Sequence, residues 1–309
     1  MTARLAEEWF AICGGCEVTV LDIGEPLLEV LKQVDIVHMP VLMDHKLYGQ
    51  TGENEEISIP EADIGILTGG IRNEEHKKIA IEMRKKVKTL ISLGSCATHG
   101  GIPALANLST TDQLLEKVYH GSRTTDGNGI PHEEIPPLTD RVYAVSEVVP
   151  VDISLPGCPT TPSMVAGALM ALLEGKPFNP PTKSVCDECP TKREKKAGSS
   201  LKRRFEEPEF DVDAPISEMR CLMEQGFLCL GPATLAGCAE DSGVPRCVRA
   251  HVPCEGCFGP LTAKSNPMVD MMGALSSIGL DPKQIPDRAA TFNRFAGAGR
   301  LRPVPGGKR

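Results

Sequence analysis

Cysteine occurs in the same local setting at three places that are far apart in the chain. Cys13 and Cys16 lie in "AICGGCEVTV", Cys96 in "LISLGSCATHGG" and Cys158 in "ISLPGCPTTPS". Each setting is a short apolar run, then a turn with glycine and cysteine, then a helical pattern. If the apolar runs are strands of one parallel sheet, their carboxyl ends meet in a crevice where ligands bind. We therefore expect these four cysteines to converge.

Glycine is frequent in the same turns, at positions 14, 15, 94, 100 and 157. Because glycine has no side chain, the backbone at these positions can approach a bulky cofactor closely. Backbone N–H groups there can donate hydrogen bonds to thiolates and sulfides, which tunes a redox potential. The turns therefore suit a bulky group that is bound through sulfur.

The first half of the chain alternates between strand-like and helix-like patterns. Short apolar runs bounded by turn residues predict buried strands at 34–43, 63–68, 88–93 and 141–149. Helical periodicity predicts helices at 18–33, about 73–87, 111–119 and 161–174. This alternation is typical of a parallel sheet covered on both faces.

The chain changes character at the stretch 177–190, which contains four prolines. Beyond it strands are scarce, and Cys, Gly and Pro interrupt short helical or irregular pieces. This part has too few periodic apolar residues for an ordinary core, but bound metal centres can supply folding free energy. We expect an α/β domain at 1–178 and a mostly irregular and helical domain at 179–309.

The second half carries eight further cysteines, in "CDEC", "RCLMEQGFLC", "AGC", "PRC" and "PCEGC". In a reducing compartment, clustered cysteines are typical of metal-binding or catalytic sites. Zinc is the rival to iron–sulfur clusters, but the spacings do not match a compact finger or ribbon. A thioredoxin-like dithiol at Cys13 and Cys16 would leave ten cysteines unexplained. The total of twelve is three times the thiolate count of one [4Fe–4S] cluster.

The charge and hydropathy patterns exclude two classes of partner. A net charge of −8 argues against general nucleic-acid binding. The N-terminus lacks a secretion signal, and no apolar run approaches the roughly 20 residues of a membrane helix. We therefore expect a cytoplasmic protein without direct membrane insertion. Residues 191–204 carry seven basic residues against one acidic, which suits a solvated insertion or a docking patch for an acidic partner.

Taken together, the motifs resemble those of the small subunit of [NiFe] hydrogenases over essentially the whole chain. They are "CGGC", "GSCATHGG", "PGCPTTP", "CLMEQGFLCLGPAT" and "PCEGC". They are most similar to those of the methyl-viologen-reducing hydrogenase of methanogenic archaea, which does not reduce the deazaflavin coenzyme. The resemblance implies a flavodoxin-like domain followed by a cluster-binding domain.

The resemblance also implies three [4Fe–4S] clusters. It assigns the proximal cluster to Cys13, Cys16, Cys96 and Cys158, the medial cluster to Cys238, Cys247, Cys254 and Cys257, and the distal cluster to Cys186, Cys189, Cys221 and Cys229. Many membrane-bound relatives have a histidine in place of Cys186. They often have proline near Cys247, which leaves them a three-iron medial cluster.

Three other residues near the cysteines, Glu17, His99 and His251, are candidates for a role at the clusters. Glu17 is either a proton relay beside the proximal cluster or a first-turn carboxylate favoured by the helix dipole. His99 and His251 lie near clusters in the sequence. We interpret both as packing or hydrogen-bonding groups, because twelve thiolates already fill three clusters.

By resemblance, dihydrogen is split at a Ni–Fe centre in a separate large subunit. This chain lacks that subunit's second CxxC followed closely by histidine, so it is expected to relay electrons. The acceptor implied is a small [2Fe–2S] subunit that leads to heterodisulfide reductase. The alternatives are the small subunit of the deazaflavin-coenzyme-reducing hydrogenase, a complex I-like cluster subunit, which matches only the first half, and a non-redox zinc-binding scaffold.

Overall fold

The computed structural model describes residues 2–44, 46–49, 51–126, 129–194, 200–203 and 206–303. The chain divides into two compact units. Unit 1 comprises Met1–Phe178 and Phe295–Arg309, and unit 2 comprises Asn179–Arg294. The division after residue 178 coincides with the start of the proline-rich stretch. The segment from Phe295 belongs to unit 1, whereas the sequence-based division placed it in the second domain.

The return of the chain to unit 1 has a local cause. The backbone N–H of Ala298 donates a hydrogen bond to the carbonyl of His99, at 3.0 Å. The Ala298 side chain is buried in a small core with Ala104, Val142 and Ala144. The sequence of this segment, which is rich in glycine and alanine, gave no sign of these contacts.

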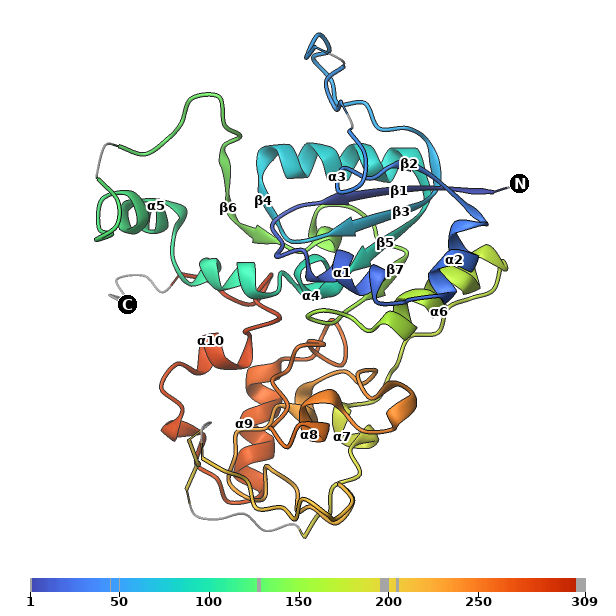
Figure 1. Cartoon of the computed structure of the whole chain (residues 1–309). Helices are drawn as coiled ribbons and strands as arrows, with labels where there is room; N and C mark the ends of the chain where they lie inside the picture. The colour runs from blue at the N-terminus through green and yellow to red at the C-terminus, as the bar shows by residue number, and fades with distance from the viewer. Residues whose placement is uncertain are drawn as a thin grey trace. The chain divides into compact units, whose positions relative to one another are not determined.

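Unit 1 is built on a five-stranded sheet in the order β2-β1-β3-β5-β7, and every neighbouring pair is parallel (Figure 1). The strands are β1 (Ala3–Trp9), β2 (Val34–His38), β3 (Ala62–Thr68), β5 (Val87–Leu93) and β7 (Ile153–Leu155). If these five strands are renumbered 1 to 5 along the chain, their order in the sheet is 2-1-3-4-5, which is that of a flavodoxin-like fold. The predicted α/β class is therefore confirmed.

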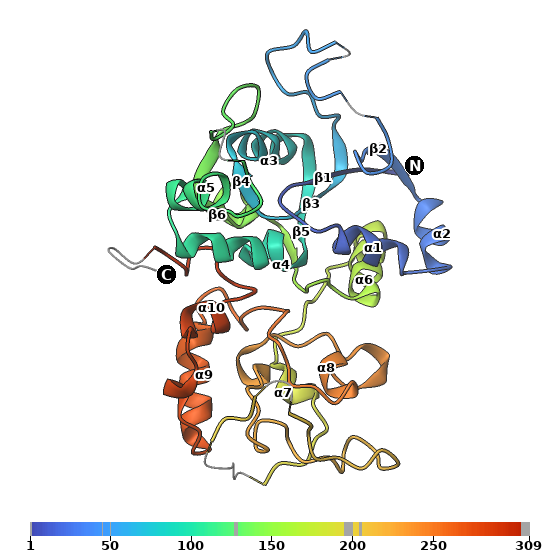
Figure 2. The same cartoon turned by 60° about the vertical axis from the view of Figure 1, so that its left-hand side comes forward.

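Helices cover both faces of this sheet (Figure 2). The α-helices of unit 1 are α1 (Gly15–Leu21), α2 (Pro26–Leu31), α3 (Glu74–Lys86), α4 (Gly94–His99), α5 (Thr111–Tyr119) and α6 (Pro162–Leu173). Ala6 of β1 packs beneath α3 with Ala80 and Met83. Because side chains alternate along a strand, Leu5 and Glu7 face the other side, toward α1, α2 and α6.

Three predicted elements differ from the structure. The single helix at 18–33 was wrong: Gly24, at φ +71°, lies in the turn that follows α1, and Pro26 begins α2. The strand at 34–43 ends at His38. The strand at 141–149 is replaced by β6 (Leu138–Tyr143) and a 3₁₀ helix (Val145–Glu147).

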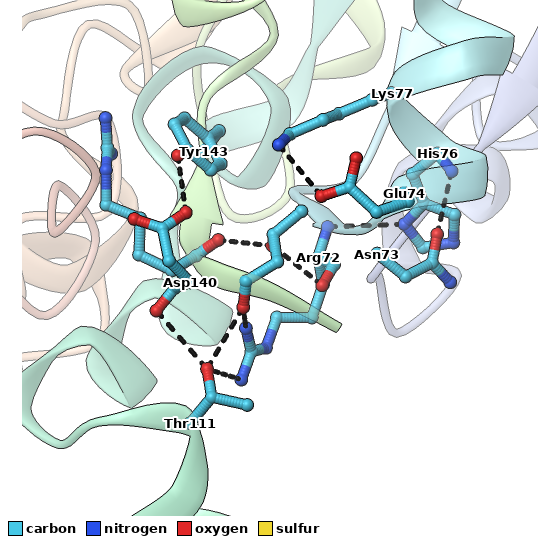
Figure 3. Close-up of polar contacts among 10 residues, drawn as sticks. Arg72, Asn73, Glu74, His76, Lys77, Thr111, Asp140 and Tyr143 are labelled. Carbon is cyan, nitrogen blue, oxygen red and sulfur yellow. Dashed lines mark hydrogen bonds and ion pairs between the residues drawn. The ribbon is translucent and has the colours of Figure 1, made fainter. Parts of the chain in front are cut away.

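Strand β6 does not join the parallel sheet but pairs antiparallel with β4 (Ile71–Asn73). Arg72 anchors this pair to α5, as Figure 3 shows: its Nη1 donates to the Thr139 carbonyl at 2.6 Å and its Nη2 to Thr111 Oγ1 at 3.3 Å. The Tyr143 hydroxyl donates to Asp140 Oδ1 at 2.5 Å. Charge-assisted hydrogen bonds of this kind fix the excursion of the chain between β5 and β7.

Unit 2 has few long elements. Its helices are α7 (Val185–Glu188), α8 (Arg246–Arg249), α9 (Pro267–Ser277) and α10 (Arg288–Phe292). Two small cores are present, one around Met271, Leu275 and Phe292 and another around Leu222 and Phe227. The described part of this unit contains no named strand, and the sequence analysis expected strands to be scarce there.

Among the residues that the structure describes, no helix combines the length and apolar character needed to cross a bilayer.

Candidate functional site

The three cysteine-bearing turns of unit 1 meet at the carboxyl end of the sheet. Cys13 and Cys16 follow β1, Cys96 lies in α4 after β5, and Cys158 follows β7. The β5 and β7 turns are joined because the Ser95 N–H donates to the carbonyl at position 157 (2.7 Å) and the N–H at 157 donates to Ser95 Oγ (3.0 Å). The predicted convergence at this sheet edge is therefore present.

The backbone at Gly94 lies very close to the turn that carries Cys13 and Cys16. It adopts φ +84°, and a Cβ atom at this position would lie 2.3 Å from Cys16 Sγ. Any side chain would therefore displace the thiol. A Cβ atom on Gly15 would lie 3.5 Å from Cys13 Sγ and 3.9 Å from the Cβ of Pro159, the residue after Cys158. All three turns thus border the same small region.

The four thiols would repel one another as thiolates. Burial raises the pKa of Cys16, and negative charge on Glu17 and on the other three cysteines raises it further. Burial, followed by Cys158 and Cys13, raises the pKa of Cys96 to about 12. A bound metal centre relieves this repulsion, because its positive ions offset the negative charge of the thiolates that bind them.

Glu17 lies against the end of β3, next to these thiols. Thr68 Oγ1 donates a hydrogen bond to Glu17 Oε1 at 2.7 Å. Glu17 Oε2 is buried and has no hydrogen-bond partner among the described residues. A partly buried carboxyl group with one buried, unsatisfied oxygen is unlike an ordinary helix-end residue and is typical of a functional position. The proton-relay interpretation of Glu17 therefore stays open.

Glu7, which is 5% exposed, is a buried carboxyl group near Glu17 that the sequence analysis missed. Burial, followed by the charges of Glu17 and Glu8, raises its pKa to about 8. Glu7 and Glu17 line the same apolar cavity of about 150 Å³, on the side of the sheet covered by α1 and α2. The available signal was a carboxylate inside an apolar strand, in "ARLAEEW".

In unit 2, the four cysteines predicted as the distal set line one small cavity, together with Cys254. Burial raises the pKa of Cys186 to about 12. The charge of Arg193 opposes this shift, and Cys189 and Cys221 add to it. A Cβ atom on Gly231 would lie 3.1 Å from Cys186 Sγ and 3.7 Å from Cys229 Sγ. The structure therefore brings Cys186, Cys189, Cys221 and Cys229 together.

The cysteines predicted as the medial set are linked more loosely. Burial raises the pKa of Cys238, and Cys247 is among the charges that raise it further. Burial also raises the pKa of Cys254, and the contributing charges are Cys229, Cys257 and Cys247. Cys254 therefore interacts with its own predicted set and with Cys229 of the distal set.

The donor chemistry of these sets suits iron–sulfur ligation. None of the twelve cysteines, all of which lie in the described ranges, forms a disulfide. The N–H groups of Gly231 and Cys254 hydrogen-bond to Cys229, and that of Gly256 to Cys254, as in centres tuned by N–H···S contacts. No group of three His, Cys, Asp or Glu side chains within the described ranges is arranged to hold a single metal ion.

The two histidines near the cysteines make packing contacts, as interpreted from the sequence. Burial, followed by the charge of Arg300, lowers the pKa of His99 to about 4, so its ring is neutral. His251 stacks on Phe210 with 3.9 Å between ring centroids.

Sequence comparison finds a family match and a relative that is similar over nearly its whole length. Residues 13–172 match the model of the family described as NADH ubiquinone oxidoreductase, 20 Kd subunit. The chain is 41% identical over 287 residues to a subunit of the vhu F420-non-reducing hydrogenase of Methanocaldococcus jannaschii. That alignment covers 92% of this chain and 91% of the relative.

Solved structures of hydrogenases are similar to parts of the chain. A chain of the NAD⁺-reducing [NiFe]-hydrogenase in the H₂-reduced state superposes with a TM-score of 0.52 and 31% identity, covering 58% of this chain and 95% of that one. A chain of the [NiFeSe] hydrogenase from Desulfovibrio vulgaris Hildenborough gives a TM-score of 0.53 at 18% identity, over 85% of this chain and 95% of that one. The second likeness concerns the fold alone.

Proposed function

The chain belongs to the NADH ubiquinone oxidoreductase 20 kDa subunit family and, within it, to the small subunits of methanogen [NiFe] hydrogenases, and we propose that it carries electrons through three iron–sulfur clusters. It is thus one subunit of an oxidoreductase that works as a complex. The electrons come from dihydrogen oxidised on a separate large subunit. The chain itself holds no dihydrogen-splitting site in this proposal.

The observation that carries the proposal is the meeting of three turns at one edge of the sheet. Cys13, Cys16, Cys96 and Cys158 come from the ends of three strands and interact electrostatically. We assign them to a proximal [4Fe–4S] cluster. The corresponding assignments in unit 2 are Cys238, Cys247, Cys254 and Cys257 for a medial cluster and Cys186, Cys189, Cys221 and Cys229 for a distal cluster.

When bound, a cluster of this kind accepts and releases one electron at a time. The residues of this chain set the conditions for that chemistry. The cysteine thiolates would hold the irons, and N–H groups of residues such as Gly231 would stabilise negative charge on sulfur. Apolar neighbours such as Val185, Leu222 and Val248 line the cavity of the distal set and would limit the access of water to a bound cluster. Each factor shifts the reduction potential of its centre.

We also propose that Glu17 moves a proton beside the proximal set. Its Oε1 is held by Thr68 and its Oε2 is buried without a partner in the described chain, so one oxygen is available to accept a proton. Glu7, with its pKa raised to about 8, borders the same cavity and can exchange protons near neutral pH. Glu17 and Glu7 together would couple the movement of a proton to the arrival of an electron at the proximal set.

The proposed partners follow from the same family. We propose a [NiFe] hydrogenase large subunit as electron donor, and a [2Fe–2S] subunit that leads to the heterodisulfide reductase complex as acceptor, in the cytoplasm. The alternative acceptor is the flavoprotein subunit of a deazaflavin-coenzyme-reducing hydrogenase. A test of the purified complex with each acceptor distinguishes the two.

The experiment is anaerobic affinity purification of the tagged chain from its native host. The co-purifying chains are identified, and hydrogen-dependent reduction of methyl viologen is assayed for the complex and for the chain alone. The proposal predicts activity with nickel in the complex and none in the isolated chain. Sustained hydrogen uptake by the isolated chain would contradict it.

A further inference from the structure

The motif "CDEC" contains two acidic residues whose roles the proposed clusters leave open. Asp187 and Glu188 lie between Cys186 and Cys189 and carry the same charge. Although they are neighbours in the chain, they contact different parts of unit 2. The two residues can therefore be compared directly.

Asp187 makes local contacts within its own motif. Its Oδ2 accepts hydrogen bonds from the backbone N–H of Ser184 at 2.8 Å and from the Ser184 hydroxyl at 2.7 Å. Such bonds fix the first turn of a helix, here α7. Burial raises the pKa of Cys186, and the charge of Asp187 adds a smaller contribution. The exposed side chain of Asp187 thus has an ordinary capping role.

Glu188 instead contacts the turn that carries Cys238. Both of its carboxylate oxygens accept the backbone N–H of Gly237, each at 3.1 Å. Gly237 directly precedes Cys238 and has φ +116°, in the region that favours glycine. A side chain of the proposed distal motif therefore holds the turn of a proposed medial ligand.

Backbone pairing brings these two segments side by side. The N–H of Val185 donates to the carbonyl of Thr234 at 2.8 Å, and the N–H of Ala236 donates to the carbonyl of Lys183 at 2.9 Å. The contact made by the Glu188 carboxylate extends this pairing to the residue after Ala236. The carboxylate is therefore held in a defined place beside the second turn, so its charge acts there at a fixed distance.

Among the charges that act on Cys238, that of Glu188 has the largest effect. Burial raises the pKa of Cys238, the backbone N–H of Arg246 lowers it, and the negative charge of Glu188 raises it further. Cys247 adds to this effect, and the charge of Arg246 opposes it. Arg246 is itself paired with Glu240, with 2.7 Å between Nη2 and Oε2. The nearby positive charge is thus offset by another carboxylate.

We propose that Glu188 is a positioning residue that also lowers the reduction potential of the centre held by Cys238. It holds the turn of Cys238 through the N–H of Gly237, and its negative charge disfavours the addition of an electron to a cluster beside it. This inference rests on the proposed electron-transfer function and adds a residue to it. A carboxylate of the distal motif thereby tunes the medial centre.

The test compares two neighbouring variants that remove the same charge. Glu188→Gln keeps an oxygen that can accept the Gly237 N–H, and Asp187→Asn is the matched control. Midpoint potentials are measured by electron paramagnetic resonance during redox titration of the anaerobically purified complex, and the medial signal is the one that Cys238→Ser alters. Glu188→Gln should favour reduction of the medial centre roughly tenfold, a rise of about 59 mV for one electron. Asp187→Asn should leave this midpoint unchanged, and both variants should keep the iron content of the wild type.

A third variant gives an independent test if Glu188→Gln loses iron. Arg246→Gln removes the positive charge that opposes Glu188 at Cys238, so it should shift the same midpoint downward. An unchanged medial midpoint in Glu188→Gln with full iron content, an equal rise in Asp187→Asn, or no downward shift in Arg246→Gln would overturn the proposal. A wild-type complex without iron–sulfur centres would instead refute the proposed function itself, whereas normal centres that do not respond to these variants would refute this inference alone.

Discussion

The backbone N–H of Cys254 donates a hydrogen bond to Sγ of Cys229, with 3.3 Å between nitrogen and sulfur. The two residues belong to different proposed clusters. The contact lowers the pKa of Cys229 against the larger effect of burial, which raises it to about 12. The peptide of one ligand therefore stabilises the thiolate of a neighbouring set, and the two sets of unit 2 are physically coupled.

This coupling predicts different effects for two proposed medial ligands. Cys254→Ser and Cys257→Ser should each disturb the medial cluster. Only Cys254→Ser should also shift the resonance signal of the reduced distal cluster, because it removes the thiolate that interacts electrostatically with Cys229, whereas the peptide N–H that donates to Cys229 is kept in both variants. The measurement is electron paramagnetic resonance of the reduced complex during a redox titration. Identical distal signals in both variants would show that the contact carries no coupling.

Cys247 decides the type of the medial cluster. It is the second residue of α8, after Pro245, and proline is tolerated in the first turn of a helix. Cys247→Pro should therefore keep the fold, release about one iron per chain and leave a paramagnetic three-iron cluster in the oxidised protein. Iron analysis and a resonance spectrum of the oxidised protein test this. If neither changes, Cys247 is not a ligand.

Gly94 and Gly24 form a matched pair for testing the proximal set. Both have positive φ, but a Cβ atom at 94 would meet Cys16 Sγ, whereas one at 24 would meet no atom within 4 Å. Each alanine variant bears a backbone cost of about 1–2 kcal/mol. Gly94→Ala should in addition lose about four irons per chain, the content of one [4Fe–4S] cluster, and Gly24→Ala should lose none. Equal iron contents would mean that the turn does not shape the site.

The pKa of Glu7 predicts a dependence of stability on pH. Burial raises this pKa from the usual carboxyl range to about 8, so between pH 5 and 8 the folded state binds more protons than the unfolded state. Stability should therefore fall as pH rises through this window, by at most about 1.4 kcal/mol per pH unit. Denaturant unfolding of Glu7→Gln should show a smaller slope. An unchanged slope would assign the dependence to other groups.

The sequence predicted the features that depend on local patterns. Turn chemistry placed Cys13, Cys96 and Cys158 at the ends of strands, and the parallel sheet then required them to meet. Helix α3 and helix α6 begin where Asn73 and Thr161 cap them. These signals are contained in a few neighbouring residues.

Features that depend on tertiary contacts were missed. The apolar run at 141–149 pairs in part with β4 instead of the main sheet, because Arg72 ties Thr139 to α5. Glu7 looks like an ordinary strand residue until Glu17 is placed beside it. The contact of Cys254 with Cys229 joins residues whose spacing assigns them to separate motifs.

The most direct test of the account is the metal and sulfide content of the anaerobically purified chain. Three sets of four thiols predict about twelve irons and about twelve acid-labile sulfides per chain, in a brown protein. The measurement combines elemental analysis with a sulfide assay on the same sample, after separation from the large subunit. Zinc in place of iron, in a colourless protein without sulfide, would contradict the electron-transfer role.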